Sequence, residues 1–364
     1  MTTYRWRLSA LALSFLFVCT SAIAQNGKFV SQRNADTLAN GPAYWTPERM
    51  ASARPEPMAV KYGSPLQVTD SAELKPSGPA GAASGQRPGD SPLLAQVLTP
   101  EANLPGEAEL PLVTTYFAYP FPFVRTEVLP LTLYTSYPWS VNGKLFFTKP
   151  GIGNFVCSAT AVTSGTAPRR ALLLTAGHCV SSGNGTFWTN FQFVPALRDT
   201  VRPYGTWGWD WVTTTGEWHN NANNKRDVAF IVTSKRVSDG RSLGSVVGDA
   251  GIAWNQPDKQ QFWAHGYPAA SPFTGRRMIL CTASIAGRDS MAGVGPAPMG
   301  IGCDQTGGAS GGSWKRGSTM NNPGFTNGVF SYKYTTAQPL STYSPYFDTA
   351  IRDLWLHAQT LVSP

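Results

Sequence analysis

From about Leu112 onward, the chain consists of short runs of apolar, β-branched and aromatic residues separated by Gly, Asn and Pro. Runs of this kind are typical of strands, and the residues between them are typical of turns. Clear examples are KLFF, FVCSATAV, ALLLTA, DVAFIV, FWAHGY and GVFSY. Closely spaced short strands over roughly 250 residues predict an all-β fold, either one large sandwich or two small antiparallel barrels.

One stretch near the end of the chain has a helical period instead. The segment TAIRDLWLHAQTLV, from Thr349 to Val362, brings apolar residues to one face of a helix. These residues are Ile351, Leu354, Trp355 and Leu361. We therefore predict a C-terminal helix that packs against the β structure.

The first 24 residues have the pattern of a signal peptide. Two arginines precede an apolar run from Leu8 to Val18, and Ala22-Ile23-Ala24 forms a small-x-small cleavage site. Lipid attachment at Cys19 is the alternative, but the bulky Val18 disfavours it. No later run reaches the roughly 20 apolar residues that a spanning helix needs, so we expect a secreted or periplasmic protein without a membrane anchor.

Residues 25–111 have a different composition, rich in Pro, Gly, Ala and Ser. The stretch KPSGPAGAASGQRPGDSP offers little apolar surface to bury, and such segments tend to stay extended or disordered. We interpret residues 25–111 as a pro-region removed during maturation, with a flexible linker as the alternative. Arg125 is one candidate processing point. Residues 112–364 then form the folded domain.

Four cysteines remain once the signal peptide is removed. An even number in an exported protein favours disulfides over a metal site, and no C-x-x-C spacing supports zinc. Of the three possible pairings we expect the one that joins neighbours in sequence, because each bond then closes a short loop in one half of the chain. The pairs are Cys157 with Cys179 and Cys281 with Cys303.

The formal net charge of +8 does not indicate a nucleic-acid partner. The basic residues are scattered and form neither a run nor a stripe. We therefore expect an ordinary solvated surface.

Three motifs carry the residue types that nucleophilic catalysis by a serine requires. His178 follows an apolar strand in LLLTAGHCV, where Cys179 can fix the next residue by a disulfide. Asp227 stands where a polar loop enters the strand of NNKRDVAFIV. Ser310 lies in CDQTGGASGGSW, where glycines on both sides expose the hydroxyl and direct N–H groups into a concavity. A serine hydroxyl needs a neighbouring base, and that base must be held in one tautomer.

In this order, TAGHC, the D-x-A strand and G-x-SGG resemble the chymotrypsin/trypsin superfamily over about residues 135–360. FVCSATAV, GIAWNQ, GYPA and CDQTGGASGG resemble the bacterial and fungal branch related to staphylococcal glutamyl endopeptidase. The resemblance implies two antiparallel six-stranded β-barrels followed by the C-terminal helix. It also implies a serine-type endopeptidase that needs no cofactor or metal and acts on polypeptides, and we expect it to be a monomer.

The resemblance also assigns roles to individual residues. His178 matches the general base, Asp227 its orienting carboxylate, and Ser310 the nucleophile. The backbone N–H groups of Gly308 and Ser310 match the oxyanion hole. Ser331, in NGVFSYKY, resembles the serine whose hydroxyl approaches the aspartate and whose strand binds the substrate backbone.

Specificity and activation depart from the trypsin pattern. Ala309 stands where trypsin-like zymogens have the aspartate that receives the new N-terminus, so that ion pair cannot form here. Asp304 lies where trypsin-like enzymes keep a pocket-floor aspartate, which favours basic substrates. Lys333, two residues after Ser331, can instead pair with Asp304 or attract an acidic side chain. Asp304 as a structural turn residue and Lys333 in solvent remain the alternative.

Two other functions compete with a protease. G-A-S-G-G also fits the nucleophile elbow of α/β-hydrolase esterases, but in that fold the acid and the histidine follow the serine. Here only His357 follows Ser310. A non-catalytic protease-like binding protein is the second alternative, although no triad residue or oxyanion glycine has been lost.

Overall fold

The computed structural model describes residues 23–35, 44–61, 76–89, 113–115, 121–165, 171–258, 260–334 and 340–362. The predicted signal peptide lies outside these residues, except for Ile23 and Ala24 at the start of the first strand. No helix within these ranges combines the length and apolar character needed to cross a membrane.

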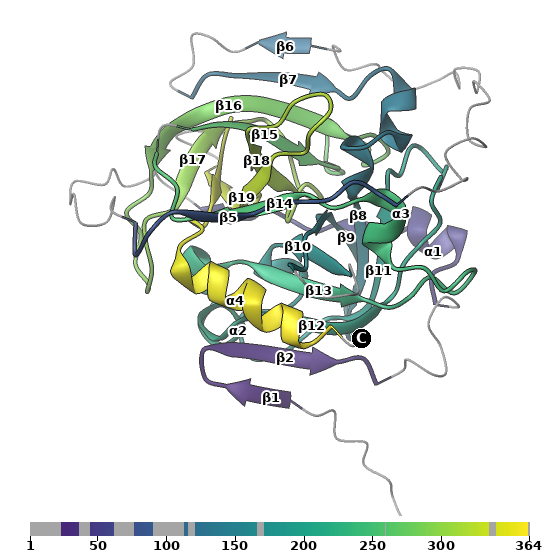
Figure 1. The fold of residues 1–364 in the computed structure, drawn as a ribbon, viewed down its shortest axis with the longest axis horizontal. Coiled ribbons are helices and arrows are strands. Elements are labelled where there is room, and N and C mark those ends of the chain that lie inside the picture. Colours follow the sequence, from purple (N-terminus) through teal and green to yellow (C-terminus); the bar gives the residue numbers. More distant parts are fainter. Residues whose placement is uncertain are drawn as a thin grey trace, which may run out of the picture.

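The described residues form two sheets, which lie one above the other in Figure 1. The first contains β1 (Ile23–Asn26), β2 (Phe29–Arg33), β3 (Arg54–Pro55), β8 (Asn142–Lys149), β9 (Gly153–Val162), β10 (Leu172–Thr175), β11 (Thr189–Pro195), β12 (Trp209–Thr215) and β13 (Ala229–Thr233). The second contains β4 (Ala59–Lys61), β5 (Gly81–Ala83), β6 (Val113–Thr115), β7 (Phe123–Glu127), β14 (Gly251–Trp254), β15 (Gln261–Gly266), β16 (Ile279–Arg288), β17 (Met299–Gly302), β18 (Ser313–Arg316), β19 (Phe325–Val329), β20 (Tyr332–Tyr334) and β21 (Ser341–Ser344).

The first sheet contains the predicted six-stranded antiparallel unit. Its strands run in the order β12-β13-β10-β9-β8-β11, and each neighbouring pair is antiparallel. An antiparallel bridge between Phe193 of β11 and Trp207, just before β12, joins the two ends. The sheet therefore closes on itself around an apolar core, as a barrel requires.

The second sheet is built mainly from β14–β21, with β15, β16 and β17 as successive antiparallel neighbours. Two pairings in this sheet depart from the antiparallel pattern, because β14 runs parallel to β19 and β4 runs parallel to β20. The all-β prediction with two curled sheets is confirmed.

The segment before residue 112 adds strands to both sheets. In the first sheet, β2 pairs with β12 and β3 with β9. In the second, β4 pairs with β20 and β5 with β14. The described parts of residues 25–111 are therefore hydrogen-bonded to the strands of the barrels, which the composition of this segment did not indicate.

Within the described ranges, helices are few and short apart from the last one. They are α1 (Pro47–Ala51), α2 (Gly216–Asn221), α3 (Leu243–Val247), α4 (Thr349–Thr360) and the 3-10 turns η2 (Leu131–Thr135), η3 (Trp139–Val141), η4 (Gly177–Cys179) and η5 (Asn224–Arg226). The predicted C-terminal helix is α4, which packs against β12, β13 and β14. Ile351, Leu354 and Trp355 are buried as expected, whereas Leu361 lies just past the helix end.

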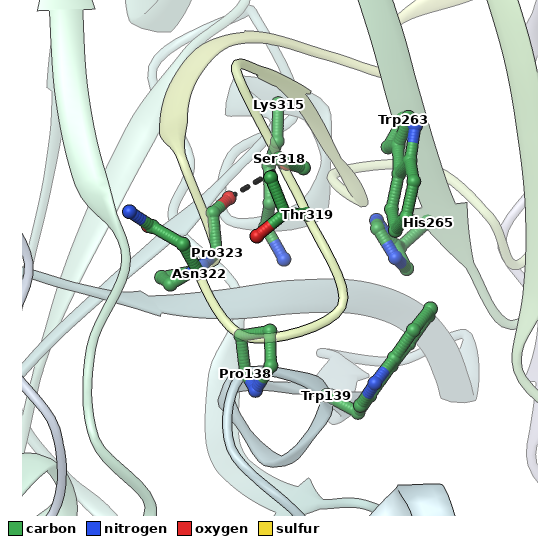
Figure 2. Close-up of a pocket in the computed structure, with 9 residues that line it drawn as sticks. All are labelled: Pro138, Trp139, Trp263, His265, Lys315, Ser318, Thr319, Asn322 and Pro323. Carbon is green, nitrogen blue, oxygen red and sulfur yellow. Dashed lines mark hydrogen bonds between the residues drawn. The ribbon is translucent and has the colours of Figure 1, made fainter.

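Polar side chains join the two sheets at their contact. Lys315 of β18 donates a hydrogen bond to Asn142 of β8, and Thr160 of β9 donates to Ser313 of β18. Burial lowers the pKa of Lys315 to about 7. Lys315 also lines a small pocket with Trp139, Trp263 and His265, and no residue of the predicted triad lines that pocket (Figure 2).

The structure contains both predicted disulfides. Cys157 is bonded to Cys179 in the first sheet, and Cys281 to Cys303 in the second. Each bond spans 22 residues, so the two barrels have equivalent covalent loops.

Candidate active site

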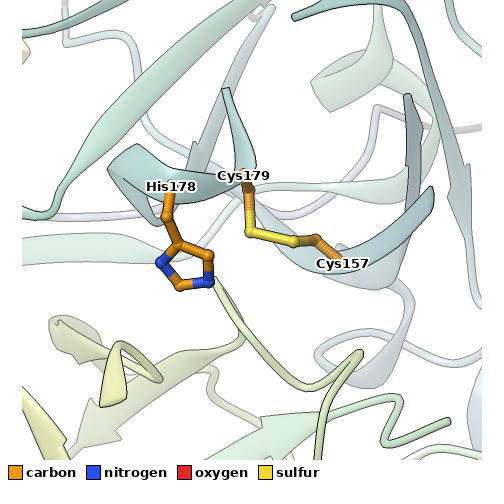
Figure 3. A group of neighbouring side chains, drawn as sticks. All are labelled: Cys157, His178 and Cys179. Atoms are coloured by element: carbon orange, nitrogen blue, oxygen red, sulfur yellow. A yellow bond between two sulfur atoms is a disulfide. The ribbon is translucent and has the colours of Figure 1, made fainter. Parts of the chain in front are cut away.

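His178 lies in η4, directly after β10, and its neighbour Cys179 is fixed to β9 by the disulfide with Cys157 (Figure 3). The indole N–H of Trp188 donates to the His178 carbonyl at 3.0 Å. Gly177 must be small, because a Cβ there would lie 2.6 Å from the Trp218 ring. The turn thus presents the imidazole in one orientation.

Asp227 lies between η5 and β13, with none of its surface exposed. Its Oδ1 accepts the backbone N–H of His178 at 2.7 Å, and its Oδ2 lies 2.8 Å from His178 Nδ1. The hydroxyl of Ser331 donates to the same Oδ2. The carboxylate therefore holds both the main chain and the ring of the histidine, and three of the predicted site residues are brought together.

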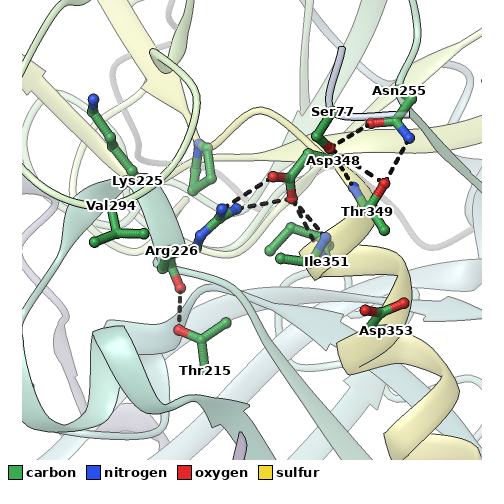
Figure 4. A network of polar contacts seen from close by, with 12 residues as sticks. Ser77, Thr215, Lys225, Arg226, Asn255, Val294, Asp348, Thr349, Ile351 and Asp353 are labelled. Carbon is green, nitrogen blue, oxygen red and sulfur yellow. Dashed lines mark hydrogen bonds and ion pairs between the residues drawn. The ribbon is translucent and has the colours of Figure 1, made fainter. Parts of the chain in front are cut away.

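The residue before Asp227 anchors this loop. Arg226 forms two ion-pair contacts with Asp348, at 2.8 and 3.0 Å, and its carbonyl accepts the Thr215 hydroxyl (Figure 4). Asp348 is also the N-cap of α4, where it accepts the backbone N–H of Ala350. The C-terminal helix is thereby tied to the loop that carries Asp227.

Charge around His178 raises its pKa above the usual value. Burial alone would lower this pKa, but the Asp227 carboxylate outweighs that effect by charge and by hydrogen bonding. Glu56 adds to the increase and Lys149 opposes it. Asp227 therefore stabilises the imidazolium form, as an orienting carboxylate does in proton transfer.

Ser310 lies in the loop between β17 and β18 of the second sheet, and this loop contacts β9 of the first sheet. Its carbonyl accepts the N–H of Ser158 in β9 at 2.7 Å, and the next residue, Gly311, donates to the Phe330 carbonyl at 2.8 Å. Gly308 has a φ of +94°, a backbone conformation that residues other than glycine rarely adopt. Glycine at position 308 is therefore needed for the path that this loop takes.

The reactive atoms predicted for catalysis are both buried. Ser310 Oγ and His178 Nε2 have no hydrogen-bond partner among the residues that the structure describes. They are therefore unsatisfied polar atoms in an otherwise hydrogen-bonded centre, which is typical of functional positions.

The predicted specificity residue Asp304 lies beside Arg125, which the sequence analysis interpreted as a processing point. Asp304 forms an ion pair with Arg125 of β7, with 3.0 Å between Oδ2 and Nε. Burial raises the pKa of Asp304, while Arg125 and then Lys333 oppose the increase. Burial lowers the pKa of Lys333 on β20, opposed by Asp304. Asp304 is thus neutralised mainly by Arg125.

Arg125 itself is only 6% exposed, inside the β7–β16 pairing. A processing protease could not reach the bond after Arg125 in this structure, so the interpretation of Arg125 as a processing point is wrong for this conformation. Arg125 is instead the ion-pair partner of Asp304. No local motif marked this role, because the pairing depends on a strand far from Asp304 in sequence.

Among the residues that the structure describes, two clusters of side chains are close enough to hold a metal ion, but both include a disulfide. One is Cys157, His178 and Cys179, and the other is Cys281, Cys303 and Asp304. The sulfur atoms are bonded to each other and are not thiolates, so neither cluster offers the anionic ligands that a cysteine metal site needs.

Comparison with solved structures identifies the family. The protease Anisep from Arthrobacter nicotinovorans is 36% identical, and the match covers 62% of this chain and 98% of Anisep with a TM-score of 0.55. The chain belongs to the chymotrypsin-like serine proteases.

Other serine proteases have similar structures. The thermostable serine protease AL20 from an extremophilic microorganism is 36% identical, with 61% of this chain and 97% of AL20 covered and a TM-score of 0.54. A Glu endopeptidase is 18% identical over 65% of this chain and 96% of its own, with a TM-score of 0.49, which is too distant to bear on specificity. No protein-family model and no curated protein sequence matches this serine protease.

Proposed function

We propose that this serine protease is a secreted endopeptidase in which Ser310 is the nucleophile, His178 the general base and Asp227 the orienting carboxylate. The observation that carries the proposal is the double contact of Asp227 with His178, through the backbone N–H and through Nδ1. With its Nδ1–H directed at Asp227, the ring has its free Nε2 available to accept a proton.

The reaction follows from this arrangement. His178 Nε2 takes the proton of Ser310 Oγ as the oxygen attacks the carbonyl carbon of a peptide bond. The resulting oxyanion accepts hydrogen bonds from the N–H groups of Gly308 and Ser310. His178 then gives the proton to the leaving amine, and water attacks the acyl-enzyme by the reverse sequence.

We further propose that residues 25–111 are a pro-region and that residues 1–24 direct export. Two disulfides support an oxidising compartment. N-terminal sequencing of the protein recovered from culture medium tests both points. A mature terminus at Gln25 alone would exclude the pro-region, and absence from the medium and periplasm would exclude export.

The test of catalysis is treatment of the mature protein with a serine-directed phosphonate, followed by peptide mapping. We expect the label on Ser310 and hydrolysis of peptides blocked at both ends, which an exopeptidase could not cleave. Ser310→Ala should abolish both. Correctly matured protein that takes no label and cleaves no peptide would support the non-catalytic alternative instead.

A further inference from the structure

A short part of the N-terminal segment crosses the proposed active site. Residues 54–55 run parallel to Phe155 and Val156 of β9, and the N–H of Glu56 donates to the Val156 carbonyl at 2.9 Å. A few residues later, β4 runs parallel to β20, with Ala59 opposite Tyr332. The segment from Arg54 to Lys61, here called the strap, therefore passes from the first sheet to the strand after Ser331.

The centre of the strap contacts the predicted oxyanion hole. The N–H of Gly308 donates to the Glu56 carbonyl at 2.9 Å. A Cβ on Gly307 would lie 2.8 Å from that oxygen and 3.4 Å from Pro57 Cα, so the strap lies directly over the glycines before Ser310. The Glu56 carbonyl thus occupies a donor that the proposed mechanism assigns to the oxyanion.

The Glu56 side chain is held at the same place. Its Oε1 forms an ion pair with Lys149 Nζ at 2.6 Å, and both side chains are largely buried. The carboxylate is also near enough to His178 to raise the pKa of that ring. A partly desolvated ion pair fixes the strap beside the proposed general base.

Met58 provides the apolar anchor. It is only 2% exposed and belongs to the apolar cluster of the second barrel together with Cys303, Ala309 and Phe330. These three residues directly precede Asp304, Ser310 and Ser331 in the sequence. Met58 is therefore buried among the elements that carry the predicted specificity and catalytic residues.

The strap sequence suits an occupant that is not cut. Glu56 stands between Pro55 and Pro57, which restricts it to extended conformations and lowers the entropy lost on binding. The peptide bond after the bound carbonyl has the ring nitrogen of Pro57 as its leaving group. That nitrogen cannot move away without the whole ring, so acylation at this bond is hindered.

We propose that residues 54–61 are a built-in inhibitor that binds the substrate cleft as an added strand, with the Glu56 carbonyl in the oxyanion hole and Met58 in the apolar cluster beside it. This inference rests on the proposed function, because the strap inhibits only if the cleft that it fills is the substrate-binding cleft of a protease. Main-chain pairing supplies affinity, and the Met58 and Glu56 side chains supply specificity.

The first test measures binding and requires no catalysis. Two double variants of the full-length protein carry Ser310→Ala. The first adds Met58→Asp, which places a charge in the apolar cluster, and the second adds Glu56→Lys, whose positive charge repels Lys149. Met58→Leu is the matched control. A fluorescein-labelled peptide of residues 54–61 should bind the first two at least roughly tenfold more tightly than the control, because a bound strap lowers the apparent affinity of its competitor.

Circular dichroism establishes which variants fold, and either releasing substitution suffices. The inference is overturned if the peptide binds no folded variant, or binds the control as tightly as the released chains. With Ser310 restored, Met58→Asp should accept the phosphonate label roughly tenfold faster than Met58→Leu. If the releasing substitutions tighten peptide binding as expected but no variant takes the phosphonate label, the strap proposal stands and the catalytic proposal is rejected. The failures of the two proposals are therefore distinguishable.

Discussion

The proposed triad and the predicted specificity residues differ in how their carboxylates are held. Asp227 accepts three hydrogen bonds from His178 and Ser331, and the residue before it is clamped to α4. Asp304 forms one ion pair, with Arg125 of β7, and Lys333 acts on its charge more weakly. The first carboxylate is fixed by several neighbours, whereas the second can be changed by one substitution. Substitutions around Asp304 that alter substrate preference should therefore leave the geometry of the proposed triad unchanged.

The largest expected effect is on kcat, and it comes from replacing Asp227, the carboxylate with more hydrogen bonds. Asp227→Asn retains the shape of the side chain but favours the wrong tautomer of His178, so kcat should fall roughly ten-thousandfold. Asp210→Asn is the control, because Asp210 is a carboxylate on β12 outside the triad. Steady-state kinetics on a blocked peptide measure both variants. Similar losses in the two would show that Asp227 has no special role.

The pocket should respond differently. Arg125→Met removes the ion-pair partner of Asp304 and leaves its buried carboxylate with only the weaker influence of Lys333, so cleavage after Lys or Arg should rise roughly tenfold relative to other residues. The unpaired charge should also lower the free energy of unfolding by about 3 kcal/mol. Peptide-library profiling and urea denaturation provide the two readouts. The double variant with Asp304→Asn should lose the basic preference, and an unchanged profile would separate Asp304 from specificity.

The two disulfides offer a matched pair, since both close loops of equal length. Replacing either pair by serine should cost about 3 kcal/mol of unfolding free energy on loop-entropy grounds. Only loss of Cys157–Cys179 should also reduce kcat in native conditions, because Cys179 adjoins His178. Equal kinetic effects from both replacements would contradict this division of roles.

The smallest effect concerns pH. His178 must be neutral to accept a proton, and its pKa is raised, so kcat/KM should fall as the pH decreases, at a higher pH than for an ordinary histidine. Asp304→Asn should leave this acid limb in place, because Asp304 is not among the charges that shift His178. A limb that moves with Asp304→Asn would mean that the pocket and the triad are electrostatically coupled.

Local patterns were sufficient for the all-β class and the C-terminal helix, whereas the family resemblance supplied the two barrels and the roles proposed for His178, Asp227 and Ser310. Strand periodicity and short motifs act over a few residues, and the family resemblance supplied their order. Arg125 and the strap were not predictable in this way. The Arg125 contact joins distant strands, and the strap pairs mainly through its backbone, which leaves no side-chain pattern in a Pro-rich segment.

The strands contributed by the N-terminal segment also have a protective consequence. Among the described strands, β4 and β5 cover both ends of the second sheet, and β2 covers β12 in the first. Uncovered edges offer rows of free N–H and C=O groups to any other extended chain. A protein produced without this segment would meet its own copies with three open edges, so self-association during refolding should increase as the segment is shortened.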